Sequence, residues 1–124
     1  MKQTVVGVFR LGHHPIQIVI REDNGGEFYF EPELGEIGRI KVGVDCAWID
    51  VVDVLLHELV EYWLADKGKR YNPTSDSSAS HDTYLFCFSH PDLSIMTHDV
   101  GVFIAESLPS IGDAYKKWHA KKKK

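Results

Sequence analysis

The sequence predicts an α+β fold in which a small antiparallel or mixed β-sheet is followed by a long helix and then by one or two further helices. Three observations support this prediction. Short β-branched runs separated by turn residues occupy the first third of the chain. Apolar residues adopt helical spacing after Asp45, and later segments carry helix start and stop signals. The 124 residues suit one compact domain, which we assign to residues 1–120, with a basic tail over 121–124.

The first 44 residues are rich in strand-forming side chains. Residues 12–15 and 23–26 are typical of turns, and the Asn-Gly and Gly-Gly pairs of the second favour a tight hairpin because glycine accepts positive φ angles. A proline-containing break covers residues 32–35. The strands between these breaks are expected at residues 4–11, 16–20, 27–30 and 37–44. Together they predict an antiparallel sheet of three or four strands.

The longest predicted helix covers residues 47–65. Its apolar side chains recur three or four positions apart, as one buried helix face requires. They are Val51, Val52, Leu55, Leu56, Leu59, Val60 and Trp63. Gly68 is a suitable stop, since glycine adopts the left-handed conformation that ends many helices. The polar residues 67–80 predict a long loop, and loops of this length in small domains often carry function.

The last third of the chain predicts further helices. Residues 82–89 fit either a strand or a short helix, because their periodicity does not separate the two. Pro91 is expected to end this element. A helix is predicted for residues 97–108 and closes at Pro109, which lacks the N–H that a helix interior needs. A last helix is predicted for residues 110–119, with Ser110 as its N-cap.

Charge is distributed unevenly along the chain. Six lysines at positions 116, 117 and 121–124 contribute +6 to a net charge of −4, so the remainder carries −10. An acidic body argues against a nucleic-acid-binding face, and the lysine-rich end is interpreted as a frayed, solubilising tail. No apolar run approaches the roughly 20 residues that span a bilayer, and the first twelve residues lack the features of a signal peptide. We therefore expect a cytoplasmic protein without a membrane partner.

The two cysteines are interpreted as reduced, structural thiols. Cys46 and Cys87 each lie among apolar residues, which raise the pKa of a thiol and disfavour a nucleophilic role. The chain also has no Gly-x-Ser-x-Gly elbow, no phosphate-binding glycine loop and no CxxC pair. The sequence therefore indicates neither a serine hydrolase nor a nucleotide-binding or thiol redox enzyme.

Residues 57–61 of the long helix read His-Glu-Leu-Val-Glu, an HExxE sequence. Residues four apart lie on one helix face, so His57 and Glu61 are able to bind the same metal ion. Glu58 is rotated by roughly 100° from His57, an offset that lets a carboxylate reach a metal-bound water without ligating the metal. This is the geometry of HExxH with the second His replaced by Glu, which is an accepted zinc ligand.

The same residues also fit an ordinary amphipathic helix. His57, Glu61 and Asp53 lie opposite the main apolar stripe, where charged side chains belong on any such helix. A bare HExxE also arises by chance more easily than a complete zinc motif. The five residues alone therefore leave open both a metal site and a solvated helix face.

Residues 53–61, which read DVLLHELVE, resemble the LLHE active-site helix of SprT-like and related minimal metallopeptidases. More narrowly, they resemble small phage and prophage proteins whose helix reads LLHExxE. In those proteins a later helix begins with His, an acidic residue and an apolar run. Residues 98–108 match this pattern with His98, Asp99 and a closing Leu108. The resemblance covers residues 43–108.

The resemblance implies a zincin-like fold and one zinc ion per chain, with His57, Glu61 and His98 as ligands and Glu58 as the catalytic base. It also implies a metallopeptidase that acts on a peptide or protein substrate in the cytoplasm of a bacterium or a phage-infected cell.

This sequence departs from the family pattern in two ways that concern the third ligand. The segment between the two helices is long, and Gly101 is unusual in the early turns of a ligand helix. His81 and His90 also follow the long helix, so both stand as alternatives to His98. Each has an ordinary interpretation as a surface loop residue.

Two other functions fit the sequence. One is a phage-encoded binding or inhibitor protein whose acidic surface captures a basic partner. The other is a structural protein that metal stabilises without chemistry. Metal content separates the hydrolase from the binding protein, and the effect of Glu58→Gln separates it from the structural protein.

Overall fold

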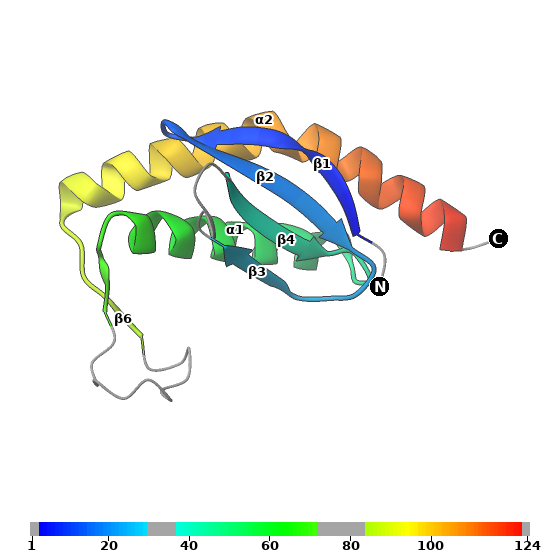
Figure 1. Cartoon of the computed structure of the whole chain (residues 1–124), viewed down its shortest axis with the longest axis horizontal. Coiled ribbons are helices and arrows are strands. Elements are labelled where there is room, and N and C mark those ends of the chain that lie inside the picture. Colours follow the sequence, from blue (N-terminus) through cyan, green and yellow to red (C-terminus); the bar gives the residue numbers. More distant parts are fainter. Residues whose placement is uncertain (1–2, 30–36, 72–83, 123–124) are drawn as a thin grey trace.

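The structure of the chain is a computed structural model that describes residues 3–29, 37–71 and 84–122. These residues form an α+β fold with a small mixed sheet and two helices (Figure 1). The elements in chain order are β1 Gln3–Leu11, β2 His14–Arg21, β3 Gly26–Tyr29, β4 Gly38–Gly43, α1 Trp48–Asp66, β5 Arg70–Tyr71, β6 Leu85–Phe86 and α2 His90–Lys122. The predicted fold class is therefore confirmed at the level of α+β.

The main sheet has the strand order β1-β2-β4-β3. β2 is antiparallel to β1 but parallel to β4, and β3 is antiparallel to β4, so the mixed alternative is observed. The hairpin expected at residues 23–26 does not form, because β4 lies between β2 and β3. The turn instead holds the end of β4. The Gly43 N–H donates to the Gly25 carbonyl, and the Asp45 N–H donates to the Asp23 carbonyl, both at 2.7 Å.

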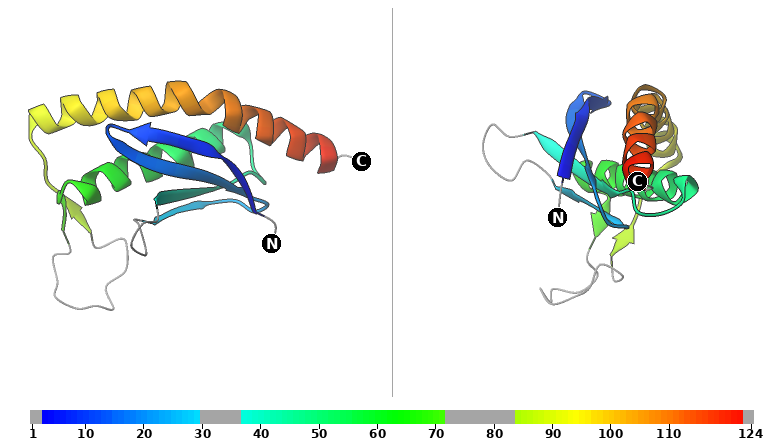
Figure 2. Two further views of the ribbon diagram at one scale, coloured as in Figure 1. Left: turned by 45° about the horizontal axis from the view of Figure 1, so that its top comes forward. Right: turned by 90° about the vertical axis from the view of Figure 1, so that its right-hand side faces the viewer.

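Both helices lie on the same side of the sheet (Figure 2). α1 packs against β3 and β4, α2 packs against β1, and the two helices also contact each other. A single hydrophobic core fills the space between these layers, with Ile16, Ile40, Leu55 and Phe103 fully buried in it. Phe9 on β1 meets Phe103 on α2 edge to face, with ring centroids 5.8 Å apart.

Helix α1 confirms the long helix predicted from apolar spacing. Its buried side carries Val51, Leu55, Leu59, Tyr62 and Trp63, which face the sheet and α2. The helix ends at Asp66, just before the expected stop residue Gly68, which has a φ of 71° and donates its N–H to the Ala65 carbonyl at 3.1 Å. Leu56, which belongs to the predicted apolar stripe, is 42% exposed.

Helix α2 differs most from the prediction. It is one continuous helix rather than two helices separated at Pro109. It also begins earlier than expected because Ser89 and Asp92 form a reciprocal cap. The Asp92 N–H donates to Ser89 Oγ at 3.3 Å, and the Ser89 N–H donates to Asp92 Oδ2 at 3.0 Å. Pro91, which was expected to end the preceding element, lies in the first turn of α2, where a missing N–H costs little.

Pro109 lies inside α2, although the sequence predicts a helix end there. A proline in a helix interior removes one hydrogen bond and costs about 3 kcal/mol. On either side of it, Phe103 and Ile111 are fully buried, and burying such side chains contributes about 1.5–3 kcal/mol each. Tertiary packing therefore outweighs the local cost, and the helix continues past the proline.

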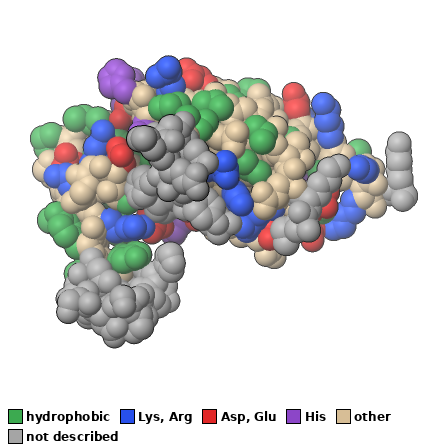
Figure 3. Space-filling model, in the orientation of Figure 1, with side chains coloured by type: hydrophobic (Ala, Val, Ile, Leu, Met, Phe, Trp, Pro, Cys, Tyr) green, Lys and Arg blue, Asp and Glu red, His purple; other side chains and the backbone are tan. Residues whose placement is uncertain are grey.

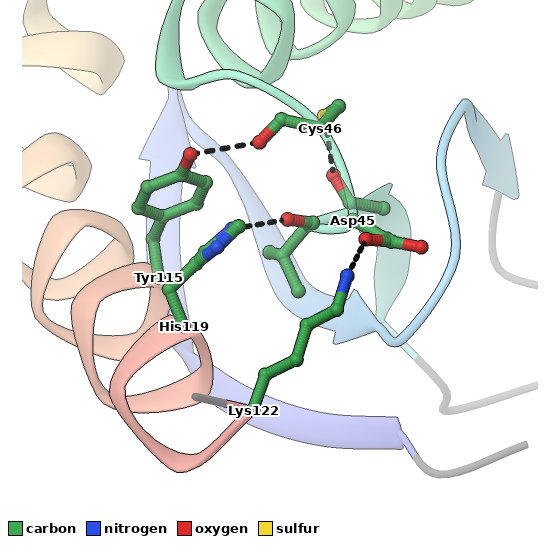
Figure 4. Close-up of polar contacts among 7 residues, drawn as sticks. Asp45, Cys46, Tyr115, His119 and Lys122 are labelled. Atoms are coloured by element: carbon green, nitrogen blue, oxygen red, sulfur yellow. Dashed lines mark hydrogen bonds and ion pairs between the residues drawn. The ribbon is translucent and has the colours of Figure 1, made fainter. Parts of the chain in front are cut away.

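The C-terminal end of α2 is held against the turn between β4 and α1 (Figure 4). Three contacts hold it there: Tyr115 Oη to the Cys46 carbonyl at 2.7 Å, His119 Nε2 to the Val44 carbonyl at 2.9 Å, and Lys122 Nζ to Asp45 Oδ1 at 2.6 Å. The frayed tail expected from position 121 therefore does not begin there, because residue 122 is helical and paired. Residues 123–124 lie outside the described residues.

The two cysteines have different surroundings. Cys46 is half-buried, and its burial, followed by the charges of Asp50 and Asp45, raises the pKa of its thiol. This agrees with the unreactive thiol expected at this position. Cys87 is exposed, which differs from the apolar surroundings expected for it.

Candidate metal site

His57 and Glu61 lie one turn apart on α1, and their side chains meet as their spacing predicts. His57 Nε2 lies 3.1 Å from Glu61 Oε2, and the two side chains are 69% and 15% exposed. Two donors that each bind zinc at about 2.0–2.1 Å with a tetrahedral angle lie about 3.3 Å apart. The observed separation is therefore close to the one that a shared zinc ion requires. The same contact is an ordinary ion pair when His57 is protonated.

Arg70 on β5 holds the other oxygen of the Glu61 carboxylate. Its Nη1 donates to Glu61 Oε1 at 3.3 Å, while Oε2 is the oxygen that faces His57. The Arg70 guanidinium lies over the Tyr84 ring, 4.4 Å from its centroid. Ligating carboxylates in metal sites are commonly oriented by such a second partner. Sequence reasoning missed Arg70, because only the chain reversal at Gly68 brings it back to α1.

Glu58 lies on a different side of α1 from His57. Its side chain is buried, with 8% exposed. It packs beside Gly26 of β3, where an added Cβ would stand 3.4 Å from Glu58 Cγ. Glutamate is almost never fully buried unless it is paired. The interpretation as a solvated helix face therefore fits the exposed His57 but does not fit Glu58.

His98 lies on α2, in a different hollow from the His57 and Glu61 pair. It lines a hollow of about 670 Å³ together with His13, His14 and Asp99. Asp99, the acidic residue that follows it, accepts a hydrogen bond from Trp63 Nε1 at 2.9 Å. His14 Nε2 shares a 2.7 Å hydrogen bond with Tyr62 Oη. Here Asp99 and His14 serve the packing of α1 against its neighbours.

The described residues bring together only two of the three expected ligands. Among them, no group of three or more His, Cys, Asp or Glu side chains is placed to hold a metal ion. His90 is the exposed first residue of α2. His81 lies outside the described residues. The identity of the third ligand therefore stays a prediction.

A hollow of about 380 Å³ adjoins the His57 and Glu61 pair. We call it the α1 hollow. Its walls are Asp53, Leu56, His57, Val60, Glu61, Leu64 and Phe86. All but one of these residues lie on α1, and Phe86 comes from β6. The candidate ligands thus line an indentation that is otherwise largely apolar.

The charged side chains of the described residues are mixed rather than segregated on the face that Figure 3 draws. Lys and Arg side chains lie among Asp and Glu there. Among the described side chains that this view shows, Asp and Glu form no continuous acidic patch. No helix in the described ranges combines the length and apolar character needed to cross a membrane.

Comparison with known proteins gives no relative for this fold and site. No protein-family model, no curated protein and no solved structure matches the chain.

Proposed function

We propose that the chain is a metal-dependent hydrolase, with zinc as the first candidate ion and a peptide bond as the simplest substrate. The proposal follows the resemblance of residues 53–61 to the small zincin-like metallopeptidases. The observation that carries it is the 3.1 Å contact between His57 Nε2 and Glu61 Oε2, with Arg70 holding the second carboxylate oxygen. An imidazole nitrogen and an oriented carboxylate oxygen are both accepted zinc donors.

The donor set suits a catalytic rather than a structural site. Catalytic zinc sites have three protein ligands and one open position, whereas structural sites are closed by four. His57 and Glu61 supply two ligands, and a histidine from later in the chain supplies the third. His98 is the first candidate because it follows the family pattern, and His81 and His90 are its rivals.

Glu58 acts as the general base in this proposal. Zinc, when bound, lowers the pKa of a coordinated water to about 7 and polarises a carbonyl group. Glu58 would take a proton from the attacking water and later pass it to the leaving amine. This role requires the attacking water to reach the carboxylate of Glu58, which is 8% exposed. His57 and Glu61 hold the ion, and Arg70 fixes the direction of the Glu61 carboxylate.

Metal content tests the proposal before any substrate is known. Elemental analysis and zinc titration of the purified chain should show about one zinc ion per chain. His57→Ala should lose most of this binding, because it removes one of the two adjacent donors. Asp50→Asn is the control, since Asp50 is exposed on α1 and lines neither the α1 hollow nor the hollow that contains His98. A wild-type chain that takes up no zinc on titration contradicts the proposal.

Thermal unfolding provides a second measurement of the same site. A ligand that binds only the folded state stabilises it, by about 2.7 kcal/mol at a free concentration of one hundred times Kd. Zinc should therefore raise the Tm of the wild type and of Asp50→Asn, but not that of His57→Ala. Equal Tm shifts in all three proteins would mean that zinc binds at a site other than His57 and Glu61.

A further inference from the structure

Two rows of side chains run beside each other along α1. Residues 53, 57 and 61 form a polar row with a spacing of four, and residues 56, 60 and 64 form an apolar row one position away. Side chains four apart make a continuous ridge on a helix. Both rows line the α1 hollow. Candidate metal-binding side chains and hydrocarbon side chains therefore lie next to each other in it.

Phe86 lines the apolar part of the hollow from the β5–β6 hairpin. Arg70 and Phe86 are register partners in this hairpin, and directly opposite residues of a strand pair share one face. Because Arg70 is paired with Glu61 at 3.3 Å, the face that carries Phe86 is held against α1. Leu85 precedes Phe86 and points to the opposite face, and it does not line the hollow.

We infer that the α1 hollow receives a large apolar side chain of a peptide substrate, such as leucine or phenylalanine, beside the bond on which the metal site acts. The inference rests on the proposed function, because His57 and Glu61 line the hollow and also form the candidate metal site. Leu56 and Phe86 are 42% and 43% exposed. A bound side chain would remove this apolar surface from water, which is favourable.

The walls favour an apolar side chain over an acidic one. Leu56, Val60, Leu64 and Phe86 offer only hydrocarbon, so a charged group placed among them would lose its hydration without gaining a partner. Asp53 also lines the hollow and repels an acidic side chain. The volume of about 380 Å³ is near the lower end of the roughly 300–1,000 Å³ found for ligand pockets. It suits one side chain with its adjoining backbone.

Two amino-acid hydroxamates probe the hollow in the zinc-loaded chain. Both present the same metal-binding group, and leucine hydroxamate adds the apolar side chain that glycine hydroxamate lacks. Calorimetric titration should show that the leucine compound binds at least about tenfold more tightly, as differences of one or more carbon groups give in apolar pockets. Phe86→Ala should reduce this ratio to below about threefold. Leu85→Ala is the matched control and should keep it.

A metal-free measurement separates the hollow from the metal site. The methyl resonances of Leu56, Val60 and Leu64 are followed by NMR while N-acetyl-leucine amide is added to the zinc-free chain. We expect shifts in these methyl signals that N-acetyl-glycine amide does not cause and that Phe86→Ala abolishes.

The two measurements give distinguishable results. Zinc binding with equal affinity for the two hydroxamates overturns the apolar subsite and leaves the metal site standing. Methyl shifts in a chain that takes up no zinc overturn the hydrolase and leave an apolar binding site. If the chain shows neither zinc binding nor methyl shifts, both the hydrolase and the apolar subsite are overturned. A leucine preference that survives Phe86→Ala also overturns the subsite as described.

Discussion

Replacing Glu58 by glutamine isolates the catalytic step of the proposed function. The two side chains have nearly the same shape, so a residue that is 8% exposed and packs beside Gly26 changes without leaving a cavity. An amide cannot serve as the general base that a carboxylate provides. We therefore expect Glu58→Gln to keep the fold and the zinc while it loses hydrolysis.

The expected loss is large, because glutamine leaves no side-chain base at position 58. A positioned general base contributes about 10²–10⁴-fold to the rate, which is about 3–5 kcal/mol of activation free energy at 1.36 kcal/mol per factor of ten. We expect a fall in kcat of at least about 10²-fold. Zinc affinity should change by less than about threefold, because Glu58 is offset from His57 by roughly 100° of helix rotation and is not one of the proposed ligands.

The assay uses the zinc-loaded chain with a pool of fluorogenic peptides that differ in the residues flanking the cleaved bond. Zinc content and circular dichroism are measured on the same samples, so that activity is compared only between folded, metal-bound proteins. Asp50→Asn is the control, because Asp50 is an exposed carboxylate on the same helix and does not line the α1 hollow. If Glu58→Gln holds its zinc and still hydrolyses peptides within about threefold of the wild-type rate, the reasoning on Glu58 is refuted.

Among alanine variants at positions 98, 81 and 90, zinc titration should show one with clearly reduced affinity, and we expect it to be His98→Ala. Full zinc binding by His98→Ala would mean that another residue is the third ligand. Tyr115→Phe removes the hydrogen bond to the Cys46 carbonyl but keeps the ring, so urea unfolding should show a loss of about 0.5–1.5 kcal/mol. Mass spectrometry after iodoacetamide treatment should find Cys87 modified before Cys46, since only Cys87 is exposed and the thiol pKa of Cys46 is raised; the reverse order would contradict the structure. A hydrogen bond from the backbone N–H of the capping serine lowers the pKa of Asp92, so its contribution to stability is present above the unfolded-state pKa and is lost as pH falls through the folded one. Acid titration of unfolding should therefore be flatter for Asp92→Asn than for the wild type.

Local patterns predicted the elements whose signals are local. The spacing of apolar residues in α1 and the glycine at its end each act within a few residues, and both are found in the structure. The order of the strands is different in kind. The turn at residues 23–26 has good hairpin residues, but its carbonyls bind Gly43 and Asp45 from a later segment. β4, which comes later in the chain, pairs with β2 at the position where the local turn residues predicted β3.

The sequence predicted α2 as two shorter helices, and its early start and its continuity were missed for separate reasons. Ser89 and Asp92 have the spacing of a reciprocal cap, and Pro91 lies where a helix tolerates proline. The start of α2 could therefore have been predicted from the sequence. The continuation of α2 through Pro109 could not be predicted from the sequence. The cost of the proline is offset by Phe103 and Ile111, which pack against the core. Local propensity is a weak guide wherever tertiary burial has the larger free energy.

In the candidate site too, local contacts could be predicted from the sequence and long-range contacts could not. The contact between His57 and Glu61 is a property of one helix turn, and the HExxE spacing is enough to predict it. Arg70 enters the site only because the chain reverses after α1 and pairs β5 with β6, which also brings Phe86 over the apolar row. One hairpin thus orients a candidate ligand and forms a wall of the adjoining hollow. A substitution that weakens the Arg70 contact should therefore change the selectivity for apolar probes as well as the affinity for zinc, and the two effects should appear together.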